Sequence, residues 1–237
     1  MNITPDTTIV VNFSGGKDSS AMLAHIMEHY GGHRIHVVMA DTGWEHTDAV
    51  DWSRSIVERY GLPLHVVRNP NKTFLTMVEK RRMFPGMGPR QCTSDLKRGP
   101  IQTWIRRNCT GHIVNAVGLR AEESSSRAKR LEWSRIDVLS KKGRDVWEWL
   151  PILHWKEARV RAYLMEKGIP LHPVYEYLNR FSCRICIYHG KKDTQSVYEN
   201  DREAFEIIAA LEKKIGHTIF MDGAIESRIN TLFNNKI

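Results

Sequence analysis

The chain has 237 residues, 41% of them hydrophobic and 26% charged, which is the ordinary composition of a folded globular protein. No apolar run approaches the roughly 20 residues that a membrane-spanning helix needs, and the polar start lacks a secretory signal pattern, so we expect a cytoplasmic protein without membrane association. The net charge is +8, and residues 80–144 alone carry sixteen Lys/Arg against five Asp/Glu, which favours an anionic partner such as a nucleotide or a nucleic acid.

The first seventy residues alternate between strand and helix patterns. Short β-branched or apolar runs at 7–13, 34–40 and 62–67 predict buried strands. Residues 19–30 and 47–60 have apolar side chains at helical spacing, and glycine follows each run. Strands that alternate with helices predict a parallel sheet with right-handed crossovers and helices on both faces.

The rest of the chain continues this pattern less regularly. A further buried strand is expected at 112–119, and helices are expected at 72–83, 100–107, 156–167 and 201–215. Residues 84–89 and 121–130 are expected to be loops, the second of them at the active site. Residues 146–152 are expected to form an edge strand, because Pro151 has no backbone N–H donor. We therefore expect an α/β core over residues 1–155 and a mainly helical, cysteine-bearing C-terminal region over 156–237, packed on that core.

A six-residue segment stands where the first strand ends and the first helix begins, and it consists of Ser14, Gly15, Gly16, Lys17, Asp18 and Ser19. A helix N-terminus presents unpaired N–H groups and the positive end of a dipole. The two glycines allow the backbone to approach phosphate oxygens, and the two serines add hydroxyl donors. Lys17 adds a positive charge, and Asp18 is placed to orient either Mg²⁺ or a neighbouring donor. The segment therefore predicts a phosphate-binding loop, shorter than the Gly-x-x-x-x-Gly-Lys loop of other nucleoside triphosphatases.

This loop resembles the PP-loop of the adenine-nucleotide α-hydrolase superfamily, which includes GMP synthetase-type amidotransferases, tRNA thiolation enzymes and phosphoadenosine phosphosulfate (PAPS) reductases. Two later segments resemble the PAPS reductase group: residues 118–124 (GLRAEES) followed by Arg127, and residues 149–155 (WLPILHW). The resemblance spans about residues 8–190, and its segments occur in the same order along the chain as in the family. It implies a Rossmann-like (HUP-type) fold and cleavage of ATP between its α- and β-phosphates.

The resemblance also implies roles for individual residues. Arginines in the later segments suit phosphate oxygens, because a guanidinium group pairs with them in a forked geometry. With ATP and Mg²⁺ as the expected cofactors, the expected catalytic residues are Lys17, Asp18, Arg120 and Arg127. Beyond the loop, the residues expected to hold the nucleotide are Asp41, Thr42, Gly43, Gly118, Glu123 and Ser124.

Three of the four cysteines predict a metal centre. Cys183 and Cys186 form a CxxC in an expected turn, which lets two thiolates reach one metal ion or cluster. Cys92 stands where adenylylsulfate (APS) reductases carry a Cys-Cys pair, and those enzymes bind a [4Fe–4S] cluster through this pair and a later CxxC. The resemblance implies such a cluster on Cys92, Cys183 and Cys186, with either one open iron or a fourth ligand such as Cys109 or His189. Zn²⁺ is the alternative, and Cys109 is expected to be structural.

The sequence departs from the PAPS and APS reductases in one respect. Those enzymes end in a Glu-Cys-Gly tail whose thiol attacks the sulfonyl group, whereas this sequence has no cysteine after Cys186. The combination resembles the ATP-pyrophosphatase subunit of DNA phosphorothioation systems. It implies adenylylation of an oxygen for sulfur transfer, with DNA more expected than tRNA as the acceptor, a sulfur donor such as a cysteine desulfurase, and partner subunits of a modification complex.

Two other kinds of function stay open at this point. One is an enzyme that acts on free sulfonucleotides, as PAPS and APS reductases do, or that thiolates tRNA. The other is a nucleotide-binding module that assembles with partner proteins and has no turnover. Pyrophosphate release separates the module from the enzymes, and nucleic-acid binding that weakens steeply with salt favours DNA or RNA over a free nucleotide.

Overall fold

The computed structural model describes residues 3–86, 88, 90–181 and 183–233. The chain forms two compact units, each assembled from segments that lie far apart in the sequence. Unit 1 consists of Met1–Ala40, Asp48–Val67 and Gly99–His172. Unit 2 consists of Asp41–Thr47, Arg68–Arg98 and Pro173–Ile237.

Unit 1 is built on a six-stranded sheet in the order β3-β2-β1-β4-β6-β5. The strands are β1 Thr8–Phe13, β2 Arg34–Asp41, β3 Leu64–Arg68, β4 Gly111–Val117, β5 Trp133–Arg135 and β6 Arg144–Trp149. β1 pairs in parallel with β2 and β4, and β4 pairs in parallel with β6. Only β5 is shown to run antiparallel to its neighbour among the described strand pairs. The predicted α/β fold with a mainly parallel sheet is therefore confirmed.

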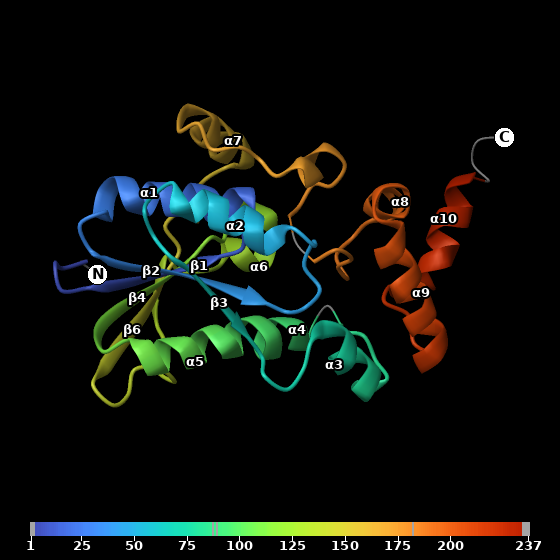
Figure 1. Cartoon of the computed structure of the whole chain (residues 1–237), viewed down its shortest axis with the longest axis horizontal. Helices are drawn as coiled ribbons and strands as arrows, with labels where there is room; N and C mark the ends of the chain where they lie inside the picture. Colours follow the sequence, from blue (N-terminus) through green and yellow to red (C-terminus); the bar gives the residue numbers. More distant parts are fainter. Residues whose placement is uncertain (1–2, 87, 89, 182, 234–237) are drawn as a thin grey trace. The chain divides into compact units, whose positions relative to one another are not determined.

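Helices cover both faces of this sheet, as Figure 1 shows for α1 and α2 on one face and α5 on the other. The helices of unit 1 are α1 Lys17–Tyr30, α2 Ala49–Glu58, α5 Gly99–Asn108, η2 Ala121–Glu123, α6 Ser125–Ala128 and α7 Glu157–Glu166. Successive side chains of a strand point to opposite faces. Ile9 and Val11 of β1 accordingly join the core beneath α1, whereas Val10 joins the core beneath α5.

The expected edge strand at residues 146–152 is wrong in one respect. β6 lies between β4 and β5, so it has a neighbour on each side. Its last residue, Trp149, pairs with Trp133 of β5, and the two rings stack with centroids 5.1 Å apart. Pro151 follows the end of β6, so its missing N–H group takes no part in the sheet. The expected loop at 121–130 also contains two short helices, η2 and α6.

Unit 2 is mainly helical. Its elements are α3 Phe74–Arg81, α4 Gln91–Thr93, the π-helical turn η1 Ser94–Arg98, η3 Pro173–Glu176, α8 Lys191–Asn200, α9 Arg202–Ile215 and α10 Ile225–Phe233. Phe205 and Ile208 of α9 pack in one core with Phe74 of α3 and Trp44. Asp201 caps the start of α9 and Gly216, with φ +70°, ends it. No described helix is both long enough and apolar enough to cross a membrane.

A buried carboxylate joins α9 to the segment that follows it. Glu212 is only 6% exposed, and its two oxygens accept hydrogen bonds from the backbone N–H groups of Ile219 at 2.8 Å and Ile225 at 2.9 Å. Because backbone N–H groups that are buried without an acceptor cost free energy, Glu212 fixes the turn between α9 and α10.

We expect Glu212→Ala to lower the free energy of unfolding by roughly 2–4 kcal/mol, because two buried N–H groups lose their acceptor. Urea unfolding followed by far-UV circular dichroism measures the change. The matched control is Glu206→Ala on the same helix, where the exposed pair with Arg202 is screened by water and is expected to contribute much less to stability. Equal losses in the two variants would contradict the role of Glu212.

Candidate active site

The predicted phosphate-binding loop connects β1 to α1 and is closed by its own hydroxyl groups. Gly15 has φ +73°, a left-handed conformation that residues with a side chain adopt only with strain. The hydroxyl of Ser19 donates to the carbonyl oxygen of Gly16 at 2.9 Å, and the backbone N–H of Ser14 donates to the Ser19 hydroxyl at 3.3 Å. The loop is thus held in a tight turn directly before the helix.

Two neighbouring elements hold the loop in place. The indole N–H of Trp52, on α2, donates to the carbonyl oxygen of Gly15 at 3.0 Å. At the end of β4, a Cβ on Gly118 would lie 3.3 Å from the backbone of Asp18 and Ser19, so glycine permits this close approach. Sequence reasoning placed Gly118 in the site but missed Trp52, which the pattern of α2 does not distinguish from a packing residue.

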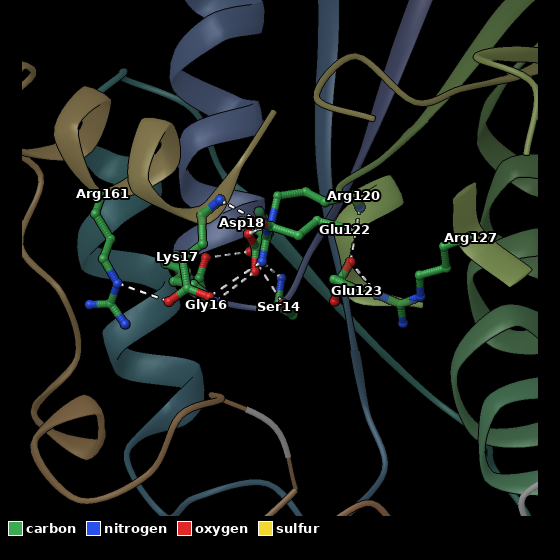
Figure 2. Close-up of polar contacts among 11 residues, drawn as sticks. Ser14, Gly16, Lys17, Asp18, Arg120, Glu122, Glu123, Arg127 and Arg161 are labelled. Carbon is green, nitrogen blue, oxygen red and sulfur yellow. Dashed lines mark hydrogen bonds and ion pairs between the residues drawn. The ribbon is translucent and has the colours of Figure 1, made fainter. Parts of the chain in front are cut away.

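Two buried cations meet one carboxylate at the start of α1 (Figure 2). Lys17 is 5% exposed and Arg120 is 3% exposed. Lys17 Nζ lies 3.1 Å from one oxygen of Asp18, and Arg120 Nε lies 2.6 Å from the other. The structure therefore brings together three of the four residues that the sequence assigns to catalysis.

Two more carboxylates approach the same cations, and sequence reasoning did not assign either to the site. Arg120 Nη1 lies 2.5 Å from Glu122. Burial lowers the pKa of Arg120, but the carboxylates of Asp18 and Glu122 raise it by more, so the pKa lies above its usual value. Glu157, the first residue of α7, makes longer contacts, at 3.6 Å to Arg120 Nη2 and 3.9 Å to Lys17 Nζ. An acidic residue in the first turn of a helix is common, so its position in the sequence gives no signal of this contact.

Arg127 reaches the group only indirectly. Its guanidinium group pairs with Glu123, whose carboxylate accepts the backbone N–H of Arg120 at 2.9 Å. The hydroxyl of Ser124 accepts the backbone N–H of Arg127 at 3.2 Å and so starts α6. In Figure 2, Arg127 lies beyond Glu123 from Lys17. A direct contact of Arg127 with phosphate stays a prediction, and its visible role is to orient Glu123.

The other residues expected at the nucleotide form a turn in unit 2. One oxygen of Asp41 accepts the backbone N–H of Gly43 at 2.7 Å, and the other pairs with Arg68. Gly43 has φ +73°, and a Cβ there would meet the side chain of Thr73 at 2.9 Å. Glu45 accepts hydrogen bonds at 2.8 Å from both the backbone N–H and the hydroxyl of Thr42. The turn is closed by these hydrogen bonds, and its nucleotide role stays a prediction.

The three cysteines of the predicted metal centre gather in unit 2 around one cation. Lys97 Nζ lies 3.9 Å from the sulfur of Cys183 and 3.7 Å from Glu45. Burial raises the pKa of Cys183 to about 12 against the effect of Lys97, and Cys186 and Cys92 raise it further. Burial, with Cys186, also raises the pKa of Cys92. In turn, Cys183 raises the pKa of Lys97. Thiols beside a lysine suit a metal centre whose bound thiolates carry excess negative charge.

The spacing of these thiols bears on the kind of metal. Within residues 3–86, 88, 90–181 and 183–233, the group of three ligand atoms that all lie within 4.8 Å of one another is His25, Glu28 and His29 on α1, not the three cysteines. A single zinc ion with Zn–S bonds of about 2.3 Å needs sulfur atoms about 3.8 Å apart. In this conformation the three sulfur atoms are not gathered as closely as one zinc ion requires, and the kind of metal stays a prediction.

The two possible fourth ligands lie in different surroundings. Cys109 is 4% exposed and packs with Ile105 and Ile113 in the core of unit 1, where burial raises its pKa to about 11. His189 is buried in unit 2, and burial lowers its pKa to about 4. Its Nδ1 has no hydrogen-bond partner among the described residues. The chemistry of a neutral imidazole therefore favours His189 over Cys109 as a fourth ligand.

Comparisons with known proteins agree with this arrangement. Residues 8–184 match the family described as the phosphoadenosine phosphosulfate reductase domain. The PAPS reductase of Alteromonas mediterranea is 27% identical over 227 residues, which cover 94% of this chain and 84% of that enzyme. An uncharacterized protein of Methanocaldococcus jannaschii is 30% identical over 75% of this chain, but the match covers only 36% of the relative. The chain thus spans about a third of the length of that relative.

A solved structure shows the same fold. The U34-tRNA thiolase NcsA from Methanococcus maripaludis, determined with its [4Fe–4S] cluster, matches 91% of this chain and 74% of its own with a TM-score of 0.53 at 16% identity. These findings confirm the resemblance to the PP-loop superfamily and its PAPS reductase group. Relatives with assigned names act on nucleotides or tRNA. The resemblance to the subunit of DNA phosphorothioation systems stays a prediction.

We expect Glu157→Gln to tighten the binding of inorganic pyrophosphate by about three- to tenfold, because a carboxylate that competes for Lys17 and Arg120 loses its charge. Isothermal titration calorimetry measures the affinity. Glu166→Gln, an exposed change at the far end of the same helix, is expected to leave the affinity unchanged. Weaker binding in Glu157→Gln would show that Glu157 orients the cations and does not compete with the ligand.

Proposed function

The chain belongs to the phosphoadenosine phosphosulfate reductase domain family, and from that premise we propose that it is an ATP pyrophosphatase. In this proposal it adenylates an oxygen for sulfur transfer, in DNA phosphorothioate modification. The observation that carries the proposal is the pair of buried cations, Lys17 and Arg120, held by Asp18 at the start of α1. A polyphosphate is the ligand that such a group, together with the N–H groups of a helix N-terminus, suits best.

The residues of the loop divide the work of binding ATP. Lys17 and Arg120 contact phosphate oxygens, and the backbone between Gly15 and Ser19 donates its N–H groups. Both oxygens of Asp18 are already used by the two cations, so we assign Asp18 first to orienting them. Mg²⁺ is then bound chiefly by the phosphates of ATP, as is usual for this ion.

The first chemical step is adenylylation. An oxygen of the acceptor attacks the α-phosphorus of ATP, a new P–O bond forms, and the bond between the α-phosphorus and the bridging oxygen to the β-phosphate breaks. Pyrophosphate leaves with the electron pair of that bond. Lys17 and Arg120 stabilise the negative charge on the phosphoryl oxygens, and because they are buried and held in place they need little reorganisation during the reaction.

The second step replaces oxygen with sulfur. Hydrosulfide attacks the adenylated centre, a bond to sulfur forms, and the bond to the activated oxygen breaks, so that AMP leaves with that oxygen. We propose that a cysteine desulfurase supplies the sulfur as a persulfide, which a thiol reductant converts to hydrosulfide. Partner subunits of a modification complex are expected to deliver the DNA.

We assign the cysteines of unit 2 to a [4Fe–4S] cluster, because a CxxC together with a further thiolate is a usual ligand set for such a cluster. Cys92, Cys183 and Cys186 would hold it, and Lys97 would offset part of the negative charge. Held by three thiolates, such a cluster supplies a Lewis-acidic iron that is open to an exogenous ligand. His189, if it binds as well, would close that position.

Two other substrates are compatible with the same loop. A free sulfonucleotide is supported by the PAPS reductase of A. mediterranea, which this chain matches over most of its length. A tRNA is the substrate of the thiolase that shares the fold. We favour DNA, as the sequence predicts, and test the three acceptors side by side.

We expect purified, metal-loaded protein to release pyrophosphate from ATP, and Lys17→Ala to lower the rate by at least about 100-fold, because one of the two buried cations is removed. A coupled pyrophosphate assay with duplex DNA, tRNA or no acceptor measures it. The control is Lys141→Ala, an exposed lysine of unit 1, with no expected effect. No pyrophosphate under any of these conditions would reject the proposal and leave a sulfonucleotide enzyme or a silent binding module.

We expect each of Cys92→Ser, Cys183→Ser and Cys186→Ser to lose most of its bound iron and sulfide, because three ligands leave no spare thiolate. Elemental analysis and the visible absorption spectrum of anaerobically purified protein measure this. Cys109→Ala, in the core of unit 1, is the control and is expected to keep the metal. Zinc without sulfide in the wild type would reject the iron–sulfur assignment.

A further inference from the structure

A cavity of about 360 Å³ lies in unit 2, on the segment that carries Cys92. The residues that line it are Gly88, Arg90, Gln91, Thr93, Ser94 and Arg98. The lining is polar apart from the glycine, and part of it is the π-helical turn Ser94–Arg98. Wide helical turns of this kind occur often at functional sites.

The two arginines of the cavity carry charge that nearby acids do not neutralise. Arg90 and Arg98 are both exposed, and neither forms an ion pair with an acidic side chain in the described part of the chain. The neighbouring acid, Asp95, pairs with Lys72 at 2.6 Å and accepts the hydroxyl of Ser94 at 2.7 Å. The cavity therefore has a net positive lining and hydroxyl and amide donors, which suits a phosphate group.

Further cations extend this positive surface beyond the cavity. Lys80, Arg81 and Arg82, at the end of α3, are exposed. Arg81 is near enough to contribute to the lowered pKa of Asp95, after the larger effects of Lys72 and Ser94. With these cations, unit 2 carries more positive charge than one phosphate group requires, which suits a ligand that bears several phosphates.

The cavity shares a short stretch of chain with Cys92, which does not itself line it. Gln91 and Thr93, which line it, flank Cys92 in the sequence. Cys92 in turn interacts electrostatically with Cys186 and Lys97. A phosphate held by Arg90 and Arg98 would therefore lie on the segment that carries Cys92.

We propose that this cavity seats a backbone phosphate of the nucleic acid that accepts the sulfur, with the cations at the end of α3 contacting neighbouring phosphates. The inference rests on the proposed function, since it names where the acceptor binds. It assigns Arg90 and Arg98 a role that the sequence motifs did not indicate.

The test compares two double variants that remove the same charge. The cavity variant combines Arg90→Gln with Arg98→Gln and removes both arginines of the cavity. The control variant combines Arg106→Gln with Arg107→Gln and removes two exposed arginines of α5 in unit 1. The probe is a fluorescein-labelled 20-base-pair DNA duplex, followed by anisotropy over a range of salt concentrations. Thermal melting of each variant shows that it is folded.

We expect the cavity variant to bind the duplex at least tenfold more weakly, and the slope of log K against log salt to fall by about one to two, because each lost phosphate contact contributes about 0.9. The control variant is expected to change both quantities much less. Equal losses in the two variants, or no loss in the cavity variant, would overturn the inference. Displacement of the duplex by adenosine 3′,5′-bisphosphate that depends on Arg90 and Arg98 would also overturn it, in favour of a free nucleotide.

The outcomes separate this inference from the proposed function, because DNA binding is measured without ATP. Duplex binding that depends on Arg90 and Arg98, in a protein that releases no pyrophosphate, supports the cavity and rejects the pyrophosphatase. Pyrophosphate release that depends on Lys17, together with duplex binding that is unchanged when Arg90 and Arg98 are replaced, supports the pyrophosphatase and rejects the role of the cavity.

Discussion

The burial of Lys17 and Arg120 around the single carboxylate of Asp18 is the constraint on which the arrangement of unit 1 depends. Two cations removed from water are costly unless anions hold them closely. Asp18 supplies one negative charge, and the carboxylates of Glu122 and Glu157 that complete the group are more exposed. The sheet, the tight loop and the close approach of β4 together keep a positive site in place before any ligand arrives, which is the preorganisation that phosphoryl chemistry requires.

In unit 2 the buried groups are potential anions, not cations. There the groups that need compensation are thiols, whose ionised forms burial disfavours, and one lysine stands among them. A metal centre lowers the cost of ionising thiols far more than a lysine does, because ligand sulfurs bind as thiolates. The protein thus combines a cluster of buried cations in unit 1 with a cluster of thiols in unit 2, for which a metal centre stays a proposal.

The sequence predicted the features that are local in the chain and missed those that join distant segments. The loop between β1 and α1, the helix after it and the CxxC are each one continuous stretch of sequence, so their residue types alone are sufficient to predict where they lie. The contact of Arg120 with Asp18 spans 102 positions and was not predicted, although the family resemblance assigned both residues to the site. Trp52 and Glu157 reach the site from separate helices, and neither carries a distinguishing pattern. The edge position of β6 was predicted from Pro151, and β5, which pairs with β6, has only three residues and is too short to show periodicity.

Unit 2 draws on residues 41–47, 68–98 and 173–237, and this arrangement has a consequence for biosynthesis. Lys97 meets Cys183 across 86 positions of sequence, so the thiols gather only after the ribosome has made most of the chain. Unit 1 needs nothing beyond residue 172, and domains generally fold as they emerge. The loop between β1 and α1 can therefore form on a nascent chain that still lacks Cys183 and Cys186, and the cluster of three thiols is completed later than this loop.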